Sequence, residues 1–169
     1  YAMGYAAQKY PRLNSLYDDQ KKKIIQLDTF NVHLAVQHEH KLLMPTVEGV
    51  LQYSPVKLRQ RIDQLKEDKR RESCVPAAML LSNIGRYGGS YARAMVMSPS
   101  IITLVAGRER PGVCLDSNGQ PFFGRQLPLS LNFDHRALSG AQAAQFLGEC
   151  LTHLRHSTFA DKKMSDIST

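Results

Sequence analysis

The sequence is poor in the features that mark several protein classes. Its 169 residues include no tryptophan and three cysteines, Cys74, Cys114 and Cys150, which form no C-x-x-C pair. Odd in number and widely spaced, they predict neither a disulfide framework nor a zinc site, and a reducing compartment is the simpler interpretation. No apolar run approaches the roughly 20 residues of a membrane span, and nothing resembles a signal peptide. Because the first residue is not methionine, we expect the chain to start partway through a larger polypeptide.

The composition is that of an ordinary globular chain. Hydrophobic residues make up 43% and charged residues 22%, and this length predicts one domain. We expect a core domain over residues 1–156 and a polar tail over 157–169. The net charge of +7 suits nucleic acid, a membrane surface, an anionic cofactor or an acidic partner. The basic residues of the helix expected after Ser54 lack interleaved aromatics, so we expect no nucleic-acid partner. A membrane partner is not expected either.

Hydrophobic periodicity predicts an α/β domain with a β-rich second half. Pro11 ends a first helix, a hairpin with exposed lysines follows, and Ser54 with Pro55 begins a second helix. Asn118-Gly119 is typical of a hairpin turn. The last helix carries Ala143, Leu147, Leu151 and Leu154 on one face. The expected strands cover 30–37, 42–47, 77–85, 100–107 and 127–133, with turns at 38–41 and 108–112 and the last helix over 139–156.

The most informative segment is LSLNFDHRALSGAQAAQFL, in which a strand ends at Asp134, His135 and Arg136 and a helix begins at once. A histidine held between a strand and a tight turn is well placed to act as a general base. On the residues alone, a strand-end histidine that hydrogen bonds to the backbone is the simpler interpretation.

This segment resembles the H-x-x-x-D-G signature of the dihydrolipoamide acyltransferases, the core enzymes of 2-oxo acid dehydrogenase complexes, and a version of it in chloramphenicol acetyltransferases. The preceding Phe133-Asp134 and the following Arg136 favour the dihydrolipoamide branch. Further segments are similar to the family in the right order: KYPRLNS, FNVHLAV with LLMPTV, LLSNIGRYGG, and MVMSPSIITLVAGR. The family domain has an additional N-terminal segment, so we expect the N-terminal part of the usual domain to be absent.

The resemblance implies a mixed β-sheet with flanking helices, as in chloramphenicol acetyltransferase, and acyl transfer between a dihydrolipoyl group and coenzyme A. In the family, the histidine matched by His135 removes a proton from a thiol, and the thiolate attacks an acyl thioester. A thiol with a pKa near ~8.5 is mostly protonated at neutral pH, so a positioned imidazole is useful. The hydroxyl matched by Ser82 donates to the oxyanion of the tetrahedral intermediate.

The resemblance also implies partners and a compartment. In the family the two catalytic residues come from different subunits of a trimer, so we expect a homotrimer or a larger cage. Coenzyme A is expected as a substrate, with the lipoyl group carried on a separate domain and other dehydrogenase subunits as partners. The compartment would be a bacterial cytoplasm or a mitochondrial matrix. His38, Glu39 and His40 fit a solvated turn better than a metal site, so no metal is expected.

One position departs from the family signature, because Ser139 replaces its aspartate. In the family that carboxylate fixes the local structure through charged hydrogen bonds. Ser139 and Gln142 still form an S-x-x-Q capping box for the last helix. The alternative to an active acyltransferase is therefore a catalytically degenerate relative with a structural or binding role in the complex core.

Overall fold

The computed structural model describes residues 1–68, 75–116 and 118–155. The predicted tail over 157–169 lies outside the described residues, so the domain boundary stays a prediction. In chain order the elements are α1 (Ala2–Lys9), the 3-10 helix η1 (Pro11–Leu13), β1 (Ser15–Asp18), β2 (Lys23–Gln26), β3 (Val32–His38), β4 (Lys41–Leu43), β5 (Thr46–Val47), η2 (Val50–Gln52), α2 (Pro55–Glu67), β6 (Met79–Asn83), η3 (Gly85–Tyr87), β7 (Ile102–Ala106), β8 (Arg110–Leu115), β9 (Pro121–Gln126), β10 (Leu129–Phe133) and α3 (Gly140–Arg155).

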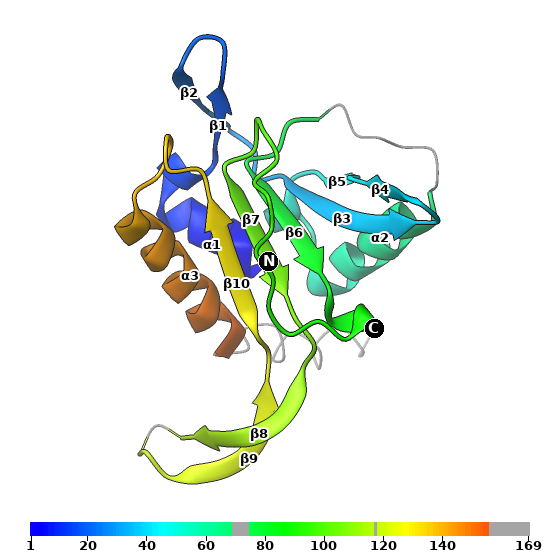
Figure 1. The fold of residues 1–169 in the computed structure, drawn as a ribbon, viewed down its shortest axis with the longest axis vertical. Helices are drawn as coiled ribbons and strands as arrows, with labels where there is room; N and C mark the ends of the chain where they lie inside the picture. The colour runs from blue at the N-terminus through cyan, green and yellow to red at the C-terminus, as the bar shows by residue number, and fades with distance from the viewer. Residues whose placement is uncertain (69–74, 117, 156–169) are drawn as a thin grey trace.

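The central sheet is mixed, with the strand order β10-β7-β6-β3-β4 and with β5 also paired to β3. Strand β6 runs parallel to both β3 and β7, whereas β10 is antiparallel to β7. Two separate hairpins, β1–β2 and β8–β9, extend from opposite ends of the body (Figure 1). The predicted α/β class and the mixed sheet with flanking helices are confirmed.

One face of the sheet forms the hydrophobic core with the helices. Strand residues of this face and buried residues of α1, α2 and α3 belong to one cluster, and they include Leu34, Met79, Ile102, Leu58 and Phe146. Alternation along each strand sends every second side chain to this face. Four of the expected strands therefore form because about half of their residues are buried against helices, whereas the strand expected over 42–47 is interrupted at Met44 and Pro45 and gives the short strands β4 and β5.

Helix α3 is buried through a face that overlaps the predicted one at Ala143 and Leu147 but is rotated away from Leu154. Its buried residues are Ala143, Phe146 and Cys150, whereas Leu154 is 43% exposed. Helix α1 packs against α3, and the Sγ atom of Cys150 lies 3.7 Å from the carbonyl oxygen of Ala2. The prediction is confirmed for Ala143 and Leu147 and wrong for Leu154, because the position of α1 selects the buried face and the periodicity of α3 alone does not.

The local signals at other boundaries have mixed outcomes. The Ser54 hydroxyl accepts a hydrogen bond from the backbone N–H of Lys57 at 3.3 Å, so the predicted cap of α2 is confirmed. The predicted turn over 108–112 is wrong in its second half, because Arg110 pairs with Gln126 and begins β8. The β8–β9 hairpin surrounds the predicted Asn118-Gly119 turn, and its strand pairing overrides the turn preference of the Pro111-Gly112 pair.

The opposite face of the sheet carries more polar side chains. Paired positions share a face, so the register assigns to it His33, Ala35, Leu80, Ser82, Thr103, Val105, Ser130 and Asn132. The segment over residues 89–100 crosses this face (Figure 1), and the Thr103 hydroxyl donates to the carbonyl oxygen of Met95 at 3.1 Å. We call this surface the polar face of the sheet.

Candidate active site

His135 lies in a tight turn directly after β10, as the sequence predicts. The backbone N–H of Asp134 donates to the carbonyl oxygen of Ile101 at 2.9 Å, and the N–H groups of Ala137 and Leu138 both donate to the carbonyl oxygen of Asp134 at 3.0 Å. The His135 ring lies 4.4 Å from the Phe133 ring, with the two planes tilted by 56°. The side chain is exposed, so the backbone around it is fixed while the imidazole remains accessible.

The neighbours of His135 lock the turn through an ion-pair network. The Arg136 guanidinium donates to both carboxylate oxygens of Asp134, with the shortest contact at 2.6 Å, and also pairs with Asp19. It lies 4.3 Å from the centre of the Tyr17 ring. Arg136 holds the pKa of Asp134 below its ordinary value. The pKa of Asp19 is also lowered. The larger cause is the hydrogen bond that the Ser98 hydroxyl donates to it at 2.7 Å, and the smaller is Arg136.

This network connects the β1–β2 hairpin to the turn that carries His135. Both carboxylates that contact Arg136 are ionised at neutral pH, and charge-assisted bonds of this kind are roughly twice as strong as neutral ones. The sequence does not predict the roles of Asp19 and Tyr17, because nothing in a local pattern indicates a contact across more than one hundred residues.

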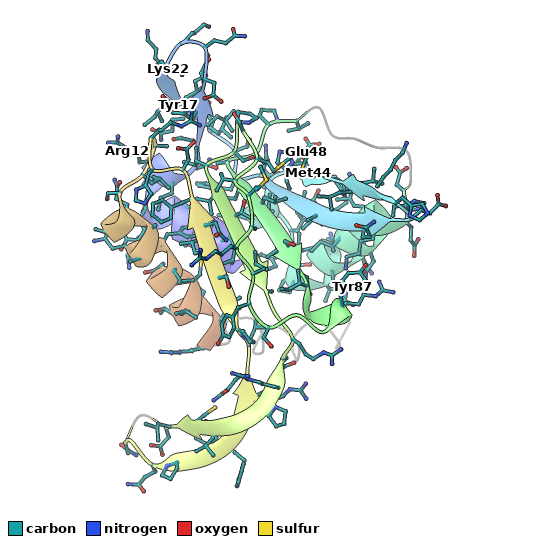
Figure 2. The ribbon with its side chains drawn as sticks, viewed as in Figure 1. Arg12, Tyr17, Lys22, Met44, Glu48 and Tyr87 are labelled. Carbon is teal, nitrogen blue, oxygen red and sulfur yellow. The ribbon has the colours of Figure 1, made fainter. Side chains whose placement is uncertain are left out.

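An open pocket lies beside His135. It is lined by Arg12, by His135 and its turn, and by Ser139, Gly140 and Gln142 at the start of α3. Figure 2 labels Arg12 close to this turn, at the base of the β1–β2 hairpin. Arg12 was not singled out from the sequence, although it stands within the KYPRLNS segment. It gives the pocket a cation that suits an anionic substrate group.

The capping box predicted at Ser139 is confirmed. The backbone N–H of Ser139 donates to Gln142 Oε1 at 2.9 Å, and the Ser139 hydroxyl accepts from the backbone N–H of Gln142 at 3.3 Å. Both groups therefore satisfy the first turn of α3, as a capping box does. The hydroxyl at the position of the signature aspartate retains the helix cap and carries no charge.

Ser82 lies near the end of β6, between Ala35 of β3 and Val105 of β7, and is half-buried. The chain that follows it is tied to the end of β7. The Asn83 side chain accepts from the N–H of Gly85 at 3.0 Å, and the N–H of Ile84 donates to the carbonyl oxygen of Ala106 at 2.9 Å. The serine thus stands on a strand, and a short fixed loop follows it.

A single chain does not bring Ser82 and His135 together. Through Val105, Ser82 is in register with Ser130 at the start of β10, whereas His135 follows the other end of that strand. With about 3.3 Å per residue and about 4.8 Å per strand, the two residues are roughly 15–20 Å apart. Figure 2 agrees, because Arg12 in the His135 pocket and Tyr87 in the loop after Ser82 lie at opposite ends of the sheet.

Within residues 1–68, 75–116 and 118–155, no group of three or more His, Cys, Asp or Glu side chains has the arrangement of a metal site. None of the helices in that part of the chain combines the length and the apolar character needed to cross a membrane.

Comparison with known proteins decides the family. The model of the 2-oxoacid dehydrogenases acyltransferase (catalytic domain) family matches residues 1–159. The chain belongs to this family. The dihydrolipoyllysine-residue acetyltransferase of the Bacillus subtilis pyruvate dehydrogenase complex is 31% identical over 86% of this chain and 34% of its own length. The Buchnera aphidicola protein of the same description, from the Acyrthosiphon pisum strain, is 29% identical over 98% of this chain.

Another relative of this acyltransferase-family chain is the mitochondrial lipoamide acyltransferase of the branched-chain α-keto acid dehydrogenase complex of Caenorhabditis elegans, 28% identical over 92% of this chain. The chain spans about 34–40% of the length of these three relatives. The activity, substrates and partners of this chain are therefore proposed in the next section.

Solved structures agree with the assignment. The dihydrolipoamide acetyltransferase of Azotobacter vinelandii superimposes with a TM-score of 0.80 at 26% identity, over 90% of this chain and 65% of that one. The cubic core of a pyruvate dehydrogenase multienzyme complex gives the same TM-score at 27% identity, also over 90% and 65%. Chloramphenicol acetyltransferase has a TM-score of 0.56 at 14% identity, over 90% and 74% of the two chains, and shares the fold. The predicted fold family is confirmed.

Proposed function

We propose that this chain transfers acyl groups between a dihydrolipoyl thiol and coenzyme A, with His135 as the general base. The observation that carries the proposal is an exposed imidazole on a turn fixed by backbone hydrogen bonds and by the pair of Arg136 with Asp134. A general base must reach the reacting thiol while its own position stays constant. The pocket beside it contains a cation, Arg12, which suits the phosphates of coenzyme A.

The reaction follows from these residues in three steps. The His135 imidazole takes the proton of the dihydrolipoyl thiol, and the thiolate sulfur bonds to the carbonyl carbon of the acyl thioester. The Ser82 hydroxyl donates a hydrogen bond to the oxygen that becomes negative. When the tetrahedral adduct collapses, the bond to the coenzyme A sulfur breaks, and that sulfur receives the proton from the imidazolium. The reverse direction uses the same groups.

The separation of Ser82 and His135 within one chain supports a site formed between two copies. A reacting carbonyl must lie about 3 Å from the oxyanion donor and within reach of the base. Within one chain the distance between Ser82 and His135 is roughly 15–20 Å, which is too long for one carbonyl to meet both conditions. We therefore propose that His135 of one copy faces Ser82 of another. Closed cyclic symmetry, such as a trimer, supplies identical pairs of this kind.

The β8–β9 hairpin supports assembly independently. Val113, Leu115 and Phe123 lie on one face of it by register, and their exposed fractions are 57%, 68% and 90%. An isolated two-stranded hairpin is marginally stable in water, and contiguous exposed apolar residues mark interaction surfaces. The relative whose structure is a cubic core forms such an assembly, and we propose a trimer or larger core for this chain.

Ser139 favours the second candidate, a catalytically degenerate subunit of a complex core, because the signature carboxylate is missing. The Azotobacter relative weakens this alternative. Its catalytic mechanism was investigated through a histidine, an asparagine four residues later and a serine 52 residues earlier. In this chain Ser139 stands four residues after His135, and Ser82 stands 53 residues before it. An uncharged side chain at this position therefore occurs in an acetyltransferase.

Complementation between two inactive variants tests the proposal. Turnover is measured as acyl transfer from acetyl-CoA to dihydrolipoamide. We expect His135→Ala and Ser82→Ala each to lower turnover about 10²-fold or more, while His40→Ala, in an exposed turn, leaves it unchanged. When the two variants are unfolded and refolded together in equal amounts, about a quarter of the sites combine an intact His135 with an intact Ser82.

We therefore expect about a quarter of the wild-type turnover in the mixed assembly and a native mass of three copies or a multiple of three. Unchanged turnover in His135→Ala refutes the base. No recovery in a mixed assembly of confirmed composition refutes the shared site, as does a stable monomer at micromolar concentration. Absence of turnover in the wild type with acetyl, succinyl and branched acyl donors supports the degenerate subunit instead.

A further inference from the structure

A cavity of about 230 Å³ shares no lining residue with the pocket of His135. Its lining is mainly apolar and combines strands β3, β4 and β6 with the segment that precedes β7. Figure 2 labels one of these residues, Met44. The lining residues are His33, Leu42, Met44, Leu80, Met97, Ser98, Pro99 and Ser100.

The cavity adjoins the proposed oxyanion donor on the polar face of the sheet. Leu80 and Ser82 are two residues apart on β6, so their side chains point to the same face about 7 Å apart. His33 pairs with Leu80, and Ala35 pairs with Ser82. A group bound at Ser82 therefore has the cavity next to it along the strand.

We propose that this cavity receives the hydrocarbon part of the transferred acyl group and gives the site a preference for apolar chains of four or five carbons. The inference rests on the proposed function, because it assumes that the acyl carbonyl binds at Ser82. If each water-sized group takes about 30 Å³, the cavity has room for about seven such groups. The single methyl of an acetyl group leaves most of that space unused, whereas the three or four carbons beyond the carbonyl of an isobutyryl or isovaleryl group fill about half of it.

The polar groups of the cavity disfavour an anionic chain. Among the residues that the structure describes, no Lys or Arg lines the cavity, and Ser98 donates to the ionised carboxylate of Asp19. The Nδ1 atom of His33 lies 2.7 Å from the Thr46 hydroxyl, which fixes the ring, and burial lowers the pKa of this histidine. A carboxylate placed there meets a neutral imidazole and a nearby negative charge, so a succinyl group loses its hydration without gaining a cation.

The test compares acyl donors on the wild-type assembly. We expect kcat/KM for isobutyryl-CoA and isovaleryl-CoA to exceed that for acetyl-CoA by about tenfold or more, since one methylene in an apolar pocket is worth about 10–200-fold at most. Succinyl-CoA is expected to be the poorest donor. The same order should appear in the affinities of the donors for His135→Ala, measured by calorimetry.

Filling the cavity should remove this preference. Met97→Phe, and independently Met44→Phe, should lower kcat/KM for isovaleryl-CoA about tenfold or more and change that for acetyl-CoA less than about twofold. Met95→Phe is the matched control. Met95 is 80% exposed, lies on the same segment and does not line the cavity, so neither donor should be affected.

The possible failures are distinct. Turnover that favours acetyl-CoA in the wild type, or that falls equally for both donors in the two filling variants, refutes the cavity assignment and leaves the proposed function standing. Absence of turnover with every donor refutes the proposed function and the cavity assignment together.

Discussion

Replacing Ser139 by aspartate restores the signature carboxylate at a place where the structure provides a cation. Arg12 lines the same open pocket, and aspartate caps a helix about as well as serine does. A carboxylate at a helix N-terminus contributes about 0.3–1 kcal/mol, and an exposed ion pair contributes about 0.2–1 kcal/mol. Because both side chains are exposed, we expect a gain of about 1 kcal/mol for Ser139→Asp. In a chain of this size, that gain raises Tm by about 2–4 °C.

The assay is thermal unfolding at two salt concentrations, together with acyl-transfer turnover. The gain in Tm should shrink in 1 M salt, where the screening length falls to about 3 Å. Ser139→Asn is the control, because it keeps the cap without the charge and should melt close to the wild type. In the Arg12→Ala background, the gain of Ser139→Asp should fall to its helix-dipole part. Turnover should rise in the single variant.

A Tm for Ser139→Asp below that of the wild type refutes this reasoning, since the new carboxylate would then be unpaired and the pocket rebuilt around serine. An equal gain in Ser139→Asn, or a gain that Arg12→Ala leaves intact, refutes the ion pair specifically. A lower Tm for Ser139→Asp, together with absence of turnover in both the wild type and this variant, supports the degenerate subunit.

Two further predictions concern the supports of the site. A Cβ on Gly107 would lie 1.9 Å from the carbonyl oxygen of Ser90, so Gly107→Ala should lower the free energy of unfolding by about 1–3 kcal/mol. Gly148 in α3 has open space around a Cβ, so Gly148→Ala should raise the free energy of unfolding. Equal denaturation midpoints for the two variants and the wild type would contradict both expectations. Because Arg136 depresses the folded-state pKa of Asp134 below 3.8, their pair adds stability above about pH 4 that is lost as the pH falls through that lower pKa. The drop in Tm between pH 7 and pH 3 should therefore be smaller in Asp134→Asn, and an unchanged drop would show that the pair adds nothing.

The sequence by itself determined the elements whose signals are local. The strand, turn and helix around His135, the cap at Ser54 and the box of Ser139 with Gln142 depend on hydrogen bonds that span a few residues. Such contacts form wherever the right side chains stand three or four positions apart. Family resemblance supplied the fold, because its motifs run in order along almost the whole chain.

Tertiary structure alone decided the arrangement between distant segments. The buried face of α3 depends on where α1 packs, and the contact between Asp19 and Arg136 joins residues more than one hundred positions apart. The distance between Ser82 and His135 follows from the strand order β10-β7-β6 and its register. No periodicity encodes which strands become neighbours, because pairing is set by the burial of whole surfaces against one another. For this physical reason the sequence named both residues of the candidate site, and only the fold placed them at opposite ends of one sheet.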